Sequence, residues 1–240
     1  MANPGVHIVS LTAPASFAAE QYQRLRLTVE RLARANGVKV IAVTSPATGD
    51  GKTVTAINLA GALARGTGDR VLLIDADLRR PSVAAQLGIE DAQTGLADVL
   101  SGGRTSIDDV VKRLDAYNLD VIPASAAPGG ISQLLRSPRL DAFLAEARQR
   151  YTYVVIDTPP LLPVPDSALL AKMVDGVLLV VSANQTARKL LAEALNMLDA
   201  SKVLGIVFNR DTRPLFGYYD ASYRAYFRDA PAGGQRAVNV

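Results

Sequence analysis

The stretch Val38-Lys39-Val40-Ile41-Ala42-Val43-Thr44-Ser45-Pro46-Ala47-Thr48-Gly49-Asp50-Gly51-Lys52-Thr53 joins an apolar, β-branched run to a glycine-containing loop, and an apolar helical pattern follows it. A phosphate-binding P-loop requires this strand–loop–helix context. Gly49 and Gly51 let the backbone curl so that its N–H groups face phosphate oxygens, and the N-terminus of the new helix adds the positive end of its dipole. The predicted nucleotide-binding residues are Thr48, Gly49, Asp50, Gly51, Lys52, Thr53 and Val54.

Two side chains at the end of this loop carry the expected chemistry. Lys52 is expected to reach the β- and γ-phosphates of ATP, and the Thr53 hydroxyl to bind Mg²⁺. The usual first glycine of the GxxxxGK[ST] pattern is Pro46 here, which stiffens the entry to the loop, and Gly49 is placed to compensate. A chance glycine turn is the alternative, but the Lys-Thr pair falls at the start of the helix and further motifs follow.

Carboxylates end two more of the predicted strands. Asp75 and Asp77 lie at and just beyond the end of one run, and Asp157 ends another. Ligands bind at this edge of an open α/β sheet. Each residue could instead cap the following helix, but three beside a P-loop favour a Mg²⁺ site, with Asp157 and Asp77 acting through water and Asp75 facing the nucleophile.

Short apolar runs alternate with helical patterns along the whole chain. Runs that are apolar throughout are typical of parallel strands buried on both faces, so the pattern predicts a doubly wound, mostly parallel α/β sheet. The predicted strands are 38–44, 71–75, 119–122, 153–157, 177–182 and 203–209. The predicted helices are 16–36, 51–65, 81–87, 94–101, 106–114, 131–136, 138–150, 166–174 and 185–199.

Length and composition fit one globular domain. The chain has 240 residues, of which 49% are hydrophobic and 20% charged, enough apolar material for a sizeable core. We expect an N-terminal arm at 1–15, one domain at 16–227 and a flexible tail at 228–240.

The absence of cysteine excludes disulfides and thiolate metal sites. With neither a secretion signal nor a run of about 20 apolar residues, the chain is expected in the cytoplasm. A net charge of +3 without a basic run argues against nucleic acid as a partner.

Three motifs together resemble those of the bacterial tyrosine kinases, or BY-kinases, of capsule and exopolysaccharide systems. They are GDGKT at 49–53, LLIDADLRRP at 72–81 and VVIDTPP at 154–160, which look like Walker A, A′ and B elements. The resemblance implies a P-loop NTPase of the deviant-Walker type with tyrosine kinase activity, in which Lys52, Asp75, Asp77 and Asp157 are catalytic. ParA/MinD-like positioning ATPases share this fold, but Ala47 replaces their signature lysine, which favours the kinase. A positioning ATPase or a regulatory subunit that only binds nucleotide are the alternatives.

A tyrosine cluster near the C-terminus is a second family feature. Four of the eight tyrosines, Tyr218, Tyr219, Tyr223 and Tyr226, fall within nine residues. The resemblance implies that they are autophosphorylated. Tyr219, Tyr223 and Tyr226 are also spaced as on one face of a helix, so an ordinary packing stripe is the alternative.

The first helix and the last strand carry weaker family signals. Glu20 and Arg26 match an ExxRxxR motif that assembles BY-kinases into rings, but Gln23 stands where the first arginine is expected. The alternative here is an exposed ion pair between Glu20 and Arg24. Asn209 ends the last strand, where related proteins place an Asn against adenine, although it also fits turn chemistry.

The resemblance also implies partners. In such systems a transmembrane protein, the polysaccharide co-polymerase, activates a free-standing kinase, and a cognate tyrosine phosphatase reverses the modification. The chain is therefore expected at the inner face of the plasma membrane, held there through its partner, and as a homo-oligomeric ring.

Overall fold

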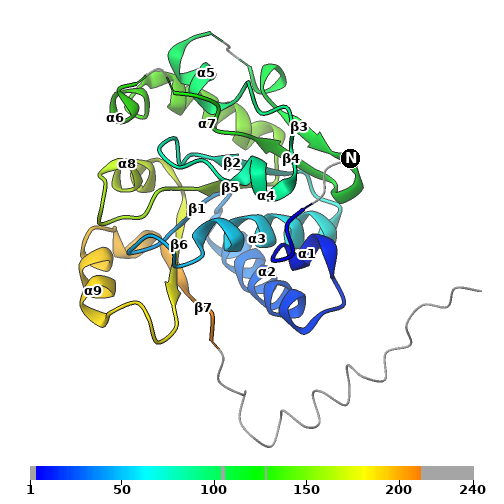
Figure 1. The fold of residues 1–240 in the computed structure, drawn as a ribbon, viewed down its shortest axis with the longest axis vertical. Helices are drawn as coiled ribbons and strands as arrows, with labels where there is room; N and C mark the ends of the chain where they lie inside the picture. Colours follow the sequence, from blue (N-terminus) through cyan, green and yellow to red (C-terminus); the bar gives the residue numbers. More distant parts are fainter. Residues whose placement is uncertain (1–3, 104–105, 128, 212–240) are drawn as a thin grey trace, which may run out of the picture. The chain divides into compact units, whose positions relative to one another are not determined.

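The computed structural model describes residues 4–103, 106–127 and 129–211. A sheet of seven strands, in the order β3-β4-β2-β5-β1-β6-β7, runs through the middle of the domain (Figure 1). Every neighbouring pair is parallel except β3 and β4. The strands are β1 (Val40–Thr44), β2 (Val71–Asp75), β3 (Lys112–Leu114), β4 (Leu119–Ile122), β5 (Tyr153–Asp157), β6 (Gly176–Ser182) and β7 (Val203–Asn209).

Helices cover both faces of the sheet. Apolar residues of α1 to α4 form one core with one face, and those of α5, α7 and α8 form a second core with the other. A smaller cluster joins α9 to β6. The helices are α1 (Val9–Thr12), α2 (Phe17–Asn36), α3 (Lys52–Thr67), α4 (Val83–Leu87), α5 (Leu96–Ser101), α6 (Ile131–Leu134), α7 (Pro138–Arg150), α8 (Asp166–Met173) and α9 (Arg188–Asn196), with 3₁₀ turns η1 (Ile107–Asp109), η2 (Asp115–Tyr117) and η3 (Ala200–Lys202).

The predicted doubly wound fold is confirmed, with one error at the edge of the sheet. All six predicted strands are present, but the helix predicted at 106–114 is wrong: this segment forms η1 and then β3. Lys112 pairs with Val121 in an antiparallel hairpin whose turn contains Asn118 at φ 51°. Pairing with the buried β4 therefore outweighs the local helical pattern.

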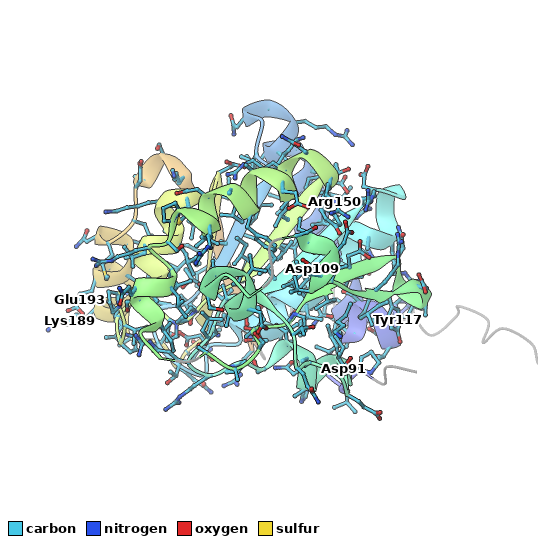
Figure 2. The ribbon with its side chains drawn as sticks, turned by 90° about the horizontal axis from the view of Figure 1, so that it is seen from above. Asp91, Asp109, Tyr117, Arg150, Lys189 and Glu193 are labelled. Atoms are coloured by element: carbon cyan, nitrogen blue, oxygen red, sulfur yellow. The ribbon has the colours of Figure 1, made fainter. Side chains whose placement is uncertain are left out.

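The two edges of the sheet lie at opposite ends of the domain. Figure 2 shows Lys189 and Glu193, on α9, at one end, and Asp91 and Tyr117, near β3, at the other. Within the part of the chain that the structure describes, no helix is long and apolar enough to cross a membrane.

The region expected as an N-terminal arm contains a packed helix. Ile8 and Leu11 are buried in the core beneath α3. The Asn58 side chain ties this segment down, because its Oδ1 accepts from the Ser10 N–H at 2.8 Å and its Nδ2 donates to the His7 carbonyl at 3.0 Å. At least residues 7–11 are therefore part of the domain.

A lysine from η3 closes the C-terminal end of α8. Lys202 Nζ donates to the carbonyls of Lys172 at 2.7 Å, Val174 at 2.9 Å and Ala171 at 3.4 Å. The last carbonyls of a helix have no partners within it and carry the negative end of its dipole, so a cation there stabilises the helix.

We predict that Lys202→Met lowers the free energy of unfolding by about 1–2 kcal/mol, because three carbonyls lose a charged donor while the apolar stem is kept. Urea unfolding followed by circular dichroism measures the change. Lys172→Met is the matched control, since that side chain is exposed on the same helix. Equal stability of the two variants would contradict the capping role.

Candidate active site

The order of the sheet brings the predicted motifs to one edge. Strands β2, β5 and β1 are consecutive neighbours, so their carboxyl ends lie side by side. Asp75 pairs in register with Asp157 across β2 and β5, and Asp157 pairs with Val43 in the strand that leads into the P-loop. The three Walker-like motifs, separate in sequence, therefore form one site.

The P-loop adopts the conformation that its glycines permit. Gly49 and Gly51 have φ of 88° and 95°, values that L side chains rarely adopt. A Cβ at Gly51 would also lie 1.9 Å from Nδ2 of Asn209. Thr48 and Gly49 are exposed at the tip of the loop, and the Val54 side chain is half-buried behind it.

Asp50 connects this loop to residues that follow β6 and end β7. Its Oδ2 accepts from the Ala47 N–H at 3.1 Å, and its Oδ1 accepts from Thr186 Oγ1 at 2.6 Å. Asn209 Nδ2 donates to the Asp50 carbonyl at 3.0 Å. The amide of Asn209 thus holds the phosphate loop, and its contact with adenine stays a prediction. Sequence reasoning missed Thr186, because nothing in its neighbourhood marks a partner 136 residues away.

Lys52 and Thr53 lie among the predicted carboxylates. Lys52 Nζ is 2.9 Å from Asp77 Oδ2 and 3.6 Å from Asp157 Oδ1. Thr53 Oγ1 donates to Asp157 Oδ2 at 2.7 Å. Ser82, which sequence reasoning did not single out, donates through Oγ to Thr53 Oγ1 at 3.3 Å. The side chain of Asp157 is fully buried, so this charge cluster is shielded from water.

Asp75 holds the Walker A′ loop by backbone hydrogen bonds. Its Oδ1 accepts from the Asp77 N–H at 3.1 Å, and its Oδ2 accepts from the Ser82 and Val83 N–H groups at 3.0 Å each. A carboxylate has about four acceptor positions, so one on Oδ1 is left for a further donor. Asp75 can therefore both shape the loop and receive a proton.

Burial changes the acidity of these groups. It raises the pKa of Asp157 to about 7, and nearby Asp75 adds to the rise while Lys52 opposes it. It raises the pKa of Asp75 to about 6, against the lowering effect of the three backbone donors. Burial lowers the pKa of Lys52, but Asp157 and Asp77 outweigh it, so that pKa ends above its usual value. At neutral pH the site therefore contains a firmly charged lysine and carboxyls close to their titration range.

The donor set fits Mg²⁺ bound mainly through water and phosphate. Among the described residues, no group of three or more acidic or histidine side chains could hold an ion alone. Asp157 Oδ1 is buried without a hydrogen-bond partner, beside the Thr53 hydroxyl. Mg²⁺ keeps several waters, so the Thr53 hydroxyl is an appropriate direct ligand and the Asp157 oxygen an appropriate partner through a water.

We predict that Asp157→Asn raises the melting temperature of the nucleotide-free protein at about pH 8, because the variant no longer buries a negative charge. Each kcal/mol gained in this way corresponds to a rise of about 2–4 °C. Between about pH 4 and pH 7 the folded state keeps a proton on Asp157 that the unfolded chain releases. The contribution of this group to stability is therefore lost as pH rises over that range and changes little above it. Thermal unfolding over a pH series should show this fall in the wild type and a smaller one in the variant. A lower melting temperature of the variant at pH 8 would show that the ionised carboxylate stabilises the fold.

Asp75→Asn is the matched control for that experiment. An amide nitrogen cannot accept from the backbone donors that Asp75 satisfies, so we expect this variant to lose about 1–3 kcal/mol. Opposite effects of the two substitutions on stability would distinguish the cost of burying a charge at Asp157 from the loss of hydrogen bonds at Asp75.

The ring-motif residues on α2 make contacts within the chain. Arg26 Nη1 lies 3.1 Å from Glu30 Oε1, with 15% of the arginine side chain exposed. A Cβ at Gly66 would lie 1.7 Å from the same nitrogen, so Arg26 packs over this glycine of α3. Glu20 and Arg24 form the surface ion pair that was the alternative reading of the motif, at 3.8 Å. The tyrosines at 218, 219, 223 and 226 lie outside the described residues.

Comparison with known proteins shows the family of the chain. Residues 38–204 match the model of a family described as an AAA domain. The chain is 34% identical over 218 residues to tyrosine-protein kinase YwqD of Bacillus subtilis, covering 89% of this chain and 91% of that protein. It is 33% identical to the succinoglycan biosynthesis transport protein ExoP of Rhizobium meliloti, covering 88% of this chain but 27% of ExoP.

A solved structure gives the same result. The kinase domain of the Escherichia coli tyrosine kinase ETK superposes with a TM-score of 0.78 at 27% identity, covering 86% of this chain and 82% of that one. The fold and the site define a P-loop NTPase of the deviant-Walker type. The chain belongs to the bacterial tyrosine kinases of capsule and exopolysaccharide systems.

Proposed function

We propose that this chain is an ATP-dependent protein-tyrosine autokinase that regulates capsular or exopolysaccharide synthesis and export. The observation that carries the proposal is the cluster of Lys52, Thr53, Asp77 and Asp157 at the end of a P-loop, in a chain of the tyrosine kinase family. The signature lysine of the positioning ATPases is missing from this loop, because Ala47 occupies its position.

The reaction transfers the γ-phosphoryl group of ATP to a tyrosine hydroxyl. The bond between the γ-phosphorus and the β,γ-bridging oxygen breaks, the γ-phosphorus forms a bond to the phenolic oxygen, and ADP leaves. Asp75 receives or orients the phenolic proton at its remaining acceptor position, and a pKa near 6 suits a base at neutral pH. Lys52 neutralises charge on the β- and γ-phosphates. Most of the catalysis is positioning, because a phenol is nearly un-ionised at pH 7.

Mg²⁺ would be held by Thr53 directly and by Asp77 and Asp157 through water. When bound, it supplies positive charge that offsets the charge of the phosphates. The P-loop backbone and the N-terminus of α3 bind the phosphate oxygens, and the Asn209 end of β7 keeps the loop in place.

The proposed acceptors are Tyr218, Tyr219, Tyr223 and Tyr226. The described tyrosines are poorer candidates. Tyr151 and Tyr153 are buried, and the Tyr151 hydroxyl donates to Asp120 at 2.8 Å; the other two, Tyr22 and Tyr117, are half-buried. Each phosphate adds a charge of about −1.5 to −2, so four would make the segment strongly anionic and repel it from a carboxylate-rich site.

We also propose how the kinase is assembled. Subunits form a homo-oligomeric ring, a transmembrane co-polymerase holds the chain at the inner face of the membrane and activates it, and a phosphatase resets it. The similarity to ExoP, which is named as a succinoglycan biosynthesis transport protein, supports the link to polysaccharide export. Arg26 is engaged with Glu30, so we expect it to stabilise α2 rather than to join subunits.

We predict that Lys52→Met abolishes autophosphorylation while the protein remains folded, because it removes the cation beside the phosphates from a loop-end position. Incubation with γ-labelled ATP, followed by phosphoamino-acid analysis, measures the product. Phosphotyrosine at the wild-type level in a folded variant would refute the site. Release of phosphate without phosphotyrosine from the wild type would instead identify a positioning ATPase.

We predict that replacing all four C-terminal tyrosines by Phe removes most phosphotyrosine and leaves ATP binding intact, since only hydroxyl groups are lost. Mixed with Lys52→Met, the four-Phe variant should label the Lys52→Met chain if transfer occurs between subunits. Absence of label in confirmed mixed assemblies would favour transfer within one subunit. Persistent label on the four-Phe chain would place the acceptor among the other tyrosines.

A further inference from the structure

A fully buried carboxylate lies beside the phosphate site without belonging to it. Asp166, the first residue of α8, accepts from Arg79 Nε at 2.6 Å through Oδ2 and from Ser132 Oγ at 2.6 Å through Oδ1. Arg79 Nη2 lies 3.4 Å from Oδ1 and 3.3 Å from Ser132 Oγ. We call these three residues the Arg79–Ser132–Asp166 latch.

The latch joins three loops that follow neighbouring strands. Arg79 is in the Walker A′ loop after β2, Ser132 is in α6 after β4, and Asp166 begins α8 after β5. These strands are consecutive in the sheet, in the order β4-β2-β5 (Figure 1). Three side chains therefore connect the loops on the side of the site away from β6 and β7.

The loop that carries Arg79 also carries Asp77, two residues earlier. Asp77 contacts Lys52 at 2.9 Å, and its Oδ1 accepts from the Arg80 N–H at 3.0 Å. Asp75 holds both ends of this short loop through backbone N–H groups, and the latch holds Arg79 between those ends. The loop therefore has little freedom to move Asp77 away from Lys52. The two-nitrogen fork of Arg79 fixes direction as well as distance, which a single donor would not do.

We propose that Asp166, acting through Arg79, is a positioning residue for phosphoryl transfer. The latch keeps the Asp77 loop aligned with Lys52 and with the nucleotide phosphates. The carboxylate is fully buried, whereas 39% of the Arg79 side chain is exposed. Such a pair contributes little to stability once desolvation of the carboxylate is counted, so a role in alignment accounts better for burying it here. The proposal rests on the kinase function proposed above and adds residues outside its three motif carboxylates.

Another arginine–aspartate pair offers a matched control. Arg148 Nη2 lies 2.8 Å from Asp175 Oδ1, while Asp175 Oδ2 accepts from the N–H groups of Lys39 and Val40 just before and at the start of β1. This pair lies at the amino-terminal end of β1, whereas the phosphate site lies at the carboxyl ends of the strands. Its loss therefore reports the general cost of breaking an arginine–aspartate contact.

The test compares Arg79→Ala, Arg79→Lys, Asp166→Asn and Arg148→Ala with the wild type. Autophosphorylation rate at saturating ATP and the Kd of a fluorescent ADP analogue are measured on each, with thermal unfolding as a check of folding. We expect the rate to fall about 10- to 100-fold in Arg79→Ala and Asp166→Asn. The Kd should change by less than about threefold, because the P-loop is untouched. Arg79→Lys should recover part of the rate, and Arg148→Ala should keep it.

Two results would overturn the proposal. One is a rate close to wild type in both Arg79→Ala and Asp166→Asn. The other is a fall in rate that comes with an equal loss of nucleotide affinity, or an equal fall in rate in Arg148→Ala. Either result would show general destabilisation. A wild-type chain that forms no phosphotyrosine would overturn the proposed function itself, and the latch proposal with it, whereas an active wild type with active latch variants removes only the latch.

Discussion

Burial of three carboxylates around one lysine is the constraint on which this structure depends. Asp75, Asp77 and Asp157 end or follow adjacent strands, and Lys52 is the ammonium group that contacts two of them. Strands that are apolar on both faces keep water from Asp157, so its charge is costly without a cation nearby. Strained or costly groups persist at functional sites because the surrounding structure holds them. A site with excess carboxylate fits the metal–nucleotide ligand proposed above.

The rest of the sheet edge supports this cluster from both sides. Toward β6 and β7, Thr186 and Asn209 hold the P-loop through the side chain and carbonyl of Asp50. Toward β4, the contacts of Arg79 reach α6 and α8. The phosphate loop and the Walker A′ loop are thus each held by residues from distant parts of the chain.

The sequence predicts the parts of this molecule whose signals are local. The P-loop, the three carboxylates and six strands follow from residue type and spacing, because a parallel sheet must bring its strand ends to one edge. The strand β3 could not be found in this way, since its helical spacing yields to pairing with β4. Thr186, Ser132 and Asp166 were also missed as supports of the site, because they act through partners that are far away in sequence. Single polar side chains carry no pattern that would reveal such partners.

The position of Asn209 connects the P-loop with the segment that bears the tyrosines. Asn209 ends β7 and donates to the Asp50 carbonyl, so the chain leaves the domain at the phosphate site itself. From Asn209 to Tyr218 there are nine residue steps, 218 minus 209. An extended chain covers at most about 3.3–3.6 Å per residue, which gives a reach of about 30 Å. For the proposed transfer, in-line alignment with the γ-phosphate, governed by the loops around Asp75 and Asp77, is a stricter requirement than reach on which tyrosine would accept the phosphoryl group.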